Sequence, residues 1–140
     1  MTTIELAERK GKARALAHYV FAAIMLLLLL GSFGAQGTDF FRGMWVGVTL
    51  VATLNLLPWG RWLRPGSAVA RLLDDESARE HRRMSSTAGF VAAMASSLAL
   101  TFIVPDVAAI SAFDAARVIA TAAMVASLVS FATLELQAAR

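Results

Sequence analysis

The chain has 140 residues, of which 58% are hydrophobic and only 16% are charged. Soluble domains average roughly 45–50% apolar and about 25% charged residues, so this composition argues against a soluble domain and for an integral membrane protein. The formal net charge of +3 is typical of a membrane protein that keeps Lys and Arg on its cytoplasmic side, not of a nucleic-acid-binding protein. The chain has no cysteine, which excludes disulfides and thiol catalysis.

Two apolar stretches predict the first pair of membrane-spanning helices, since about 20 apolar residues cross a ~30 Å hydrocarbon core. Residues 16–34 form the first predicted span and contain the run FAAIMLLLLL, and residues 40–58 form the second. A signal peptide is the alternative for the first stretch, but the apolar run exceeds the ~7–15 residues of a signal-peptide core. Trp59 and Trp62 mark the exit of the second span, because Trp favours the membrane–water boundary.

Residues 59–85 hold many of the charged residues and predict a cytoplasmic loop that becomes an amphipathic helix. Ser67 is the expected N-cap of this helix, since its hydroxyl accepts a hydrogen bond from a free backbone N–H. Opposite charges one turn apart, such as Glu80 and Arg83, each add about 0.2–0.5 kcal/mol to helix stability. We expect the helix to continue into the third span.

The third and fourth predicted spans are residues 86–104 and 115–135. All Lys and Arg residues except Arg42 and Arg117 then fall on one side of the four spans. The positive-inside rule therefore places both termini and the central segment in the cytoplasm. Arg42 and Arg117 are expected to snorkel outward to the opposite interface.

The predicted fold is all-α: a polytopic membrane protein with an antiparallel bundle of four transmembrane helices, a cytoplasmic amphipathic helix between spans 2 and 3, and a single domain over residues 1–140. Rows of small residues predict close helix packing in lipid. These rows are Gly43 and Gly47 in the second span, Ala88, Ala92 and Ser96 beside Gly89, Ala93 and Ser97 in the third, and Ala116, Ala120, Ala123 and Ser127 in the fourth. They suit packing within one bundle or, alternatively, a homodimer.

No residue pattern in the chain predicts catalysis, and we expect a non-enzymatic protein without a metal or a cofactor. His18 and His81 lack a ligand cluster around them and are expected to be interfacial. Asn55 is the clearest polar residue inside a span and is a candidate intramembrane polar site. The candidate partner-binding residues lie in the central helix and are Asp75, Glu76, Arg79, Arg82 and Arg83.

The stretch LLDDESAREHRRMSSTAGFVAAM, residues 72–94, resembles a pattern in small uncharacterised bacterial four-span inner-membrane proteins. In those proteins an Asp-Glu-centred helix, followed by Arg and a second basic residue, runs into an Ala/Gly-rich span. The matching positions here are Leu73, Asp75, Glu76, Arg79, Arg82 and Gly89. The resemblance implies a multi-pass protein of the bacterial inner (cytoplasmic) membrane that accompanies, and restrains, a helix-turn-helix transcription regulator.

Three functions fit these observations. The first is an accessory or regulatory membrane protein that binds a cytoplasmic or membrane partner through the charged central helix. The second is a small dimeric transporter or channel, which requires a polar path through the bilayer; the first span contains no acidic residue to carry a proton. The third is a structural subunit of a larger membrane complex.

Overall fold

A computed structural model describes residues 3–33, 38–56, 76–103 and 110–138 of the chain. All regular secondary structure in these residues is α-helical, which confirms the predicted all-α class. The four helices are α1 (Thr3–Gly31), α2 (Thr38–Leu56), α5 (Glu76–Ile103) and α6 (Ala112–Ala138).

Three of the described helices are long and apolar enough to cross a membrane. The qualifying stretches are Gly11–Gly31 with 21 residues, Ser77–Ile103 with 27 and Ala112–Ala138 with 27. They overlap the predicted first, third and fourth spans and support a membrane protein. Helix α2 is not among them, because its 19 residues include Asp39, Arg42 and Asn55, which lower its mean hydropathy. The second span therefore stays a prediction, and the loop-helix over residues 59–75 lies outside the described residues.

Helix α1 begins earlier than the predicted first span. It starts at Thr3 and runs without a break through the charged residues before the apolar stretch. These first turns are rich in Glu, Leu, Ala, Arg and Lys, all of which have high helix propensity. Helix α5 is similar, because it begins at the charged residue Glu76 and continues into its apolar part as one helix.

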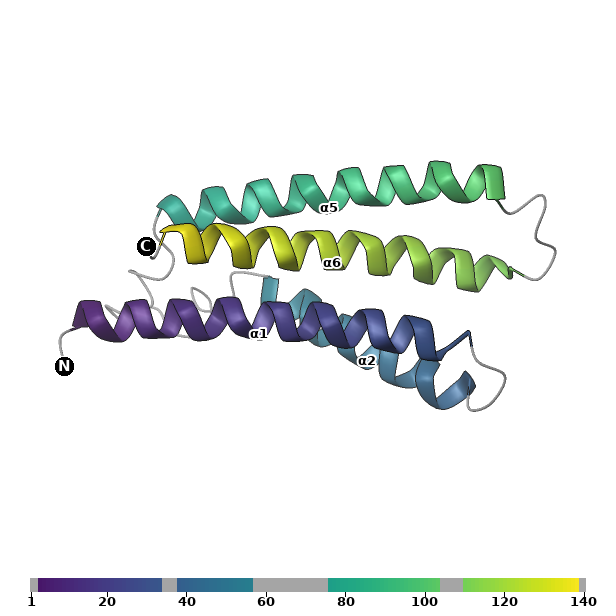
Figure 1. The fold of residues 1–140 in the computed structure, drawn as a ribbon, viewed down its shortest axis with the longest axis horizontal. Helices are drawn as coiled ribbons and strands as arrows, with labels where there is room; N and C mark the ends of the chain where they lie inside the picture. The colour runs from purple at the N-terminus through teal and green to yellow at the C-terminus, as the bar shows by residue number, and fades with distance from the viewer. Residues whose placement is uncertain (1–2, 34–37, 57–75, 104–109, 139–140) are drawn as a thin grey trace.

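Helix α6 is the central helix of the described structure. It packs along α5 on one side and along α1 on the other, while α2 packs mainly on α1 and touches α6 only slightly. Figure 1 shows α1, α6 and α5 side by side along the long axis, with α2 crossing α1 at an angle. The helices thus form an open row, α5–α6–α1–α2, in which successive helices run in opposite directions.

Helices α5 and α6 are in close contact at Gly89. A Cβ atom added there would overlap Ser127 Oγ and lie 2.9 Å from the carbonyl oxygen of Ala123. This contact joins the predicted small-residue rows of the third and fourth spans. In contrast, no described atom lies within 4 Å of a Cβ added at Gly43 or Gly47, so the GxxxG row of α2 packs against nothing in the described part of the chain.

The contact between α1 and α6 is partly polar and contains His18. This histidine is buried, with its ring centroid 5.1 Å from that of Phe131, and its Nδ1 lies 2.6 Å from the carbonyl oxygen of Arg14. The Tyr19 and Thr133 hydroxyls are hydrogen-bonded at 2.8 Å. His18 therefore faces α6 on the inside of the helix pair, and its expected place at the membrane interface stays a prediction.

Candidate functional site

The candidate partner-binding residues lie at or before the start of α5. Asp75 is outside the described residues, and Glu76 is the first residue of the helix. The side chains of Arg79 and Arg83 are exposed, whereas Arg82 is half-buried. Of the three predicted side chains that the structure describes, two are therefore presented to the surroundings.

The exposed charges of this segment form one face of the helix. Glu80 is exposed and pairs with Arg83 at 3.7 Å, which confirms that predicted ion pair. On the opposite face, Ala78 and Ser85 are buried. We call Arg79, Glu80 and Arg83 the partner-binding face, after the role that the sequence predicts for this segment. An exposed ion pair contributes only about 0–1 kcal/mol, so these charges add little to the stability of the helix.

The side-chain amide of Asn55 is hydrogen-bonded within its own helix. Its Nδ2 donates a hydrogen bond of 2.8 Å to the backbone carbonyl of Val51, one turn earlier. The residue is exposed on α2, near the last described residue of that helix. This geometry favours a local structural role for Asn55 over a place in a polar path.

A polar cluster that the sequence did not reveal lies where α2 and α6 begin. Its centre is Arg117, whose exposed fraction is only 1%, so the predicted outward snorkelling of this residue is wrong. The guanidinium carbon lies 5.4 Å from the ring centroid of Trp45 and 5.6 Å from that of Phe113. Aromatic faces attract a guanidinium, and these two rings are close enough to do so. The side chain of Arg117 therefore turns toward α2.

The start of α6 is fixed by a variant of the capping box, Ser-x-x-Asp. The backbone N–H of Asp114 donates to Ser111 Oγ at 3.1 Å, and the same hydroxyl donates to Asp114 Oδ2 at 2.6 Å. The other carboxylate oxygen, Oδ1, lies 3.5 Å from Nη1 of Arg117. Asp114 thus caps its own helix and pairs with the buried arginine one turn later.

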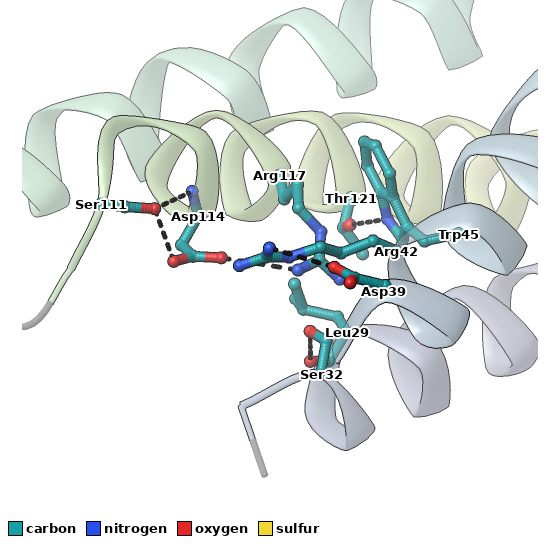
Figure 2. Close-up of polar contacts among 9 residues, drawn as sticks. All are labelled: Leu29, Ser32, Asp39, Arg42, Trp45, Ser111, Asp114, Arg117 and Thr121. Atoms are coloured by element: carbon teal, nitrogen blue, oxygen red, sulfur yellow. Dashed lines mark hydrogen bonds and ion pairs between the residues drawn. The ribbon is translucent and has the colours of Figure 1, made fainter. Parts of the chain in front are cut away.

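Helix α2 adds a second arginine to the cluster. Arg42 pairs with Asp39 at 3.6 Å, and its guanidinium carbon lies 5.3 Å from the ring centroid of Phe113. Figure 2 shows the Arg42 and Arg117 side chains directed into the region between the carboxylates of Asp39 and Asp114. The arginine cluster consists of Asp39, Arg42, Trp45, Phe113, Asp114, Arg117 and Thr121.

One signal in the sequence marks this cluster. The motif Asp-x-x-Arg occurs twice, as TDFFR at residues 38–42 and as FDAAR at residues 113–117, each time in the first turns of a helix. The spacing places each acid beside its own arginine, one turn apart. The sequence does not reveal that the two motifs meet.

A buried hydrogen bond connects α2 to α6 beside the arginines. Trp45 Nε1 donates to Thr121 Oγ1 at 2.9 Å (Figure 2). We predict that a double-mutant cycle of Trp45→Phe and Thr121→Val yields a coupling energy of about 0.6–1.7 kcal/mol, as for other hydrogen bonds between membrane helices. The measurement is the free energy of unfolding in detergent for the four variants. A coupling energy of zero would show that this bond does not stabilise the α2–α6 contact.

The described residues contain no group of three His, Asp or Glu side chains that could hold a metal ion. Comparison with protein families, with curated proteins and with solved structures finds no match to this chain. Candidate functions therefore rest on the two sites described above, the partner-binding face and the arginine cluster.

Proposed function

We propose that this chain is a non-enzymatic accessory or regulatory protein of the bacterial inner membrane, which binds a cytoplasmic partner through the partner-binding face. The observation that supports this proposal most is the placement of Arg79, Glu80 and Arg83. All three are exposed on α5, while the opposite face of the same turns is buried. Charges that stabilise their own helix only weakly are free to pair with a second molecule.

The proposed topology has four spans with both termini in the cytoplasm. It combines the three long apolar helices with α2 as the remaining span and relies on the positive-inside rule for its direction. Figure 1 is in keeping with it, because α1 begins, α6 ends and α5 begins at the same end of the row. The partner-binding face would then lie at the cytoplasmic boundary, within reach of a soluble protein.

The proposed partner is a helix-turn-helix transcription regulator, as the resemblance of residues 72–94 implies. A surface with both signs of charge selects a partner with the complementary arrangement, because like charges opposed across an interface weaken binding. The membrane protein would hold such a regulator at the bilayer and away from DNA.

Reversing the charges of the partner-binding face is expected to weaken capture of the partner. We predict that Arg79→Glu combined with Arg83→Glu lowers partner recovery about tenfold, which corresponds to roughly 1.4 kcal/mol, while membrane insertion is unchanged. Reversal of Glu76 and Arg79 together should act in the same direction. The measurement is quantitative mass spectrometry of proteins that copurify with the tagged chain from native membranes.

The control for this experiment is Arg9→Glu, which reverses an exposed charge on α1 outside the partner-binding face. Its copurifying proteins should match those of the unmodified chain. Equal recovery of every copurifying protein by the Arg79/Arg83 double variant and the control would rule the proposal out.

Two other functions that the sequence suggests remain alternatives to this proposal. Arg117 is the observation that favours a small dimeric transporter or channel, because buried charges within membrane helices often mark a substrate path. The exposed glycines Gly43 and Gly47 leave one face of α2 open for a homodimer. A structural subunit of a larger complex would also retain partners, but its copurification would not depend on the partner-binding face.

A further inference from the structure

We propose that Arg42 and Arg117 form a binding site for a phosphate-type oxyanion between the first turns of α2 and α6. This site is separate from the partner-binding face on α5, and the proposed function does not require it. Three features of the arginine cluster carry the inference: unused hydrogen-bond donors, two neighbouring positive charges, and access through a partly exposed side chain.

The first feature is the surplus of donors on the two arginines. A guanidinium carries five N–H donors and no acceptor. Of the nitrogens of Arg117, Nη1 has Asp114 nearby, while Nε and Nη2 are buried without a hydrogen-bond partner. Nε of Arg42 is buried without a partner as well. Buried donors of a charged group are costly when unpaired, so the site favours a group that accepts several hydrogen bonds.

The second feature is the concentration of positive charge. Both guanidinium carbons lie within 6 Å of the same Phe113 ring, at 5.3 and 5.6 Å from its centroid. Helices α2 and α6 also begin at this end of the row (Figure 1), so the positive ends of two helix dipoles point toward it. An oxyanion between the arginines would offset this charge, and its oxygens match the forked N–H donors of a guanidinium.

The nearby carboxylates of Asp39 and Asp114 pair with only part of the charge and the N–H donors of the two arginines. Asp114 shares its charge between Arg117 and the hydroxyl of Ser111, and its distance to Nη1 is 3.5 Å. Asp39 is almost fully exposed, so its pair with Arg42 at 3.6 Å is weakened by solvent. Neither acid reaches the unpaired Nε and Nη2 of Arg117.

The third feature is access. Arg42 has a side chain that is 41% exposed, whereas Arg117 is enclosed. An anion can therefore approach at Arg42 and reach Arg117 when the outer side chain shifts. At 1.5 Å per residue, both arginines lie within about 8 Å of the first residue of their helices, measured along the helix axis. A site so near the helix ends can be reached by the phosphate of a phospholipid headgroup as well as by free phosphate.

The site contains its own reporter for a binding experiment. The chain has three tryptophans, and replacing Trp59 and Trp62 by Phe leaves Trp45, whose ring lies 5.4 Å from the guanidinium carbon of Arg117. The fluorescence of Trp45 is measured in uncharged detergent during titration with inorganic phosphate at constant ionic strength. A second titration adds phosphatidylglycerol, and its control adds an uncharged galactolipid without phosphate.

We expect a saturable change in Trp45 fluorescence with phosphatidylglycerol, with inorganic phosphate, or with both. A response to inorganic phosphate identifies a free anion as sufficient, and a response to phosphatidylglycerol alone identifies the lipid headgroup. No response to either probe, or an equal response to the galactolipid, overturns the proposal.

Variants of the two arginines decide whether they form the site. Arg42→Gln and Arg117→Met should each weaken the apparent affinity about tenfold or more, as expected for loss of a two-pronged contact. Arg9→Gln, an exposed arginine on α1, should leave it unchanged. If Arg117→Met does not fold, Arg42→Gln alone decides, because this side chain is partly exposed. Unaltered affinity in Arg42→Gln overturns the proposal.

Discussion

Replacing Gly89 by alanine is expected to lower the free energy of unfolding by about 1–3 kcal/mol, the usual cost of overfilling a packed site. The added methyl group would overlap Ser127 Oγ and lie 2.9 Å from the carbonyl oxygen of Ala123. The serine side chain can rotate, but the backbone carbonyl cannot, so α5 and α6 would have to move apart. The measurement is unfolding of the purified chain in detergent, followed by circular dichroism.

The chain contains its own matched controls for this substitution. Gly43→Ala and Gly47→Ala place the same methyl group on α2, where no described atom lies within 4 Å. These variants should be neutral or more stable by up to about 1 kcal/mol, because alanine favours a helix more than glycine does. Similar losses for Gly89→Ala and for the α2 variants would contradict the close approach of α5 and α6.

Replacing Phe131 by alanine should be the most destabilising single change between α1 and α6. The ring is fully buried, lies 5.1 Å from that of His18, and has the guanidinium carbon of Arg14 at 4.8 Å from its centroid. Its removal leaves a cavity and deprives both α1 residues of their contact. We expect a loss of about 2–3 kcal/mol, below the ~3–5 kcal/mol typical of soluble proteins, because lipid also solvates an exposed Phe.

Phe90→Ala is the control for this prediction. Phe90 is an aromatic residue of α5 that is largely exposed in the described structure, so its removal should change the unfolding free energy by less than about 0.5 kcal/mol. Both variants are compared by the same detergent unfolding measurement. If Phe131→Ala were no more destabilising than Phe90→Ala, α1 and α6 would not be joined as described.

The sequence predicted the element types because the relevant signals are local. Long apolar stretches between charged segments are visible without any neighbour, and three of the resulting helices are long enough to span a membrane. The pairing of Glu80 with Arg83 is equally local, since one helical turn brings the two side chains together. In contrast, the helical start of α1 was missed, because its charged residues resemble a solvated tail.

The sites were less predictable, and the arginine cluster shows the reason. Arg117 was expected to turn to the interface, because an arginine near a helix end usually does so. Its guanidinium lies instead beside the ring of Trp45, a residue of α2 that is far away in the chain. The two Asp-x-x-Arg motifs can be recognised in the sequence. That they lie close together follows only from the packing of α2 against α6.

The sequence by itself determined that this protein is helical and belongs in a membrane, through composition and the length of its apolar stretches. Only the tertiary structure decided which faces of the helices meet. Gly89 packs against Ser127, while Gly43 and Gly47 have no neighbour within 4 Å, although all three are small residues in apolar helices. The physical reason is that lipid and the interior of a helix bundle are both apolar. In the sequence of a membrane helix, the side that faces lipid is therefore not distinguished by polar residues from the side that packs against another helix.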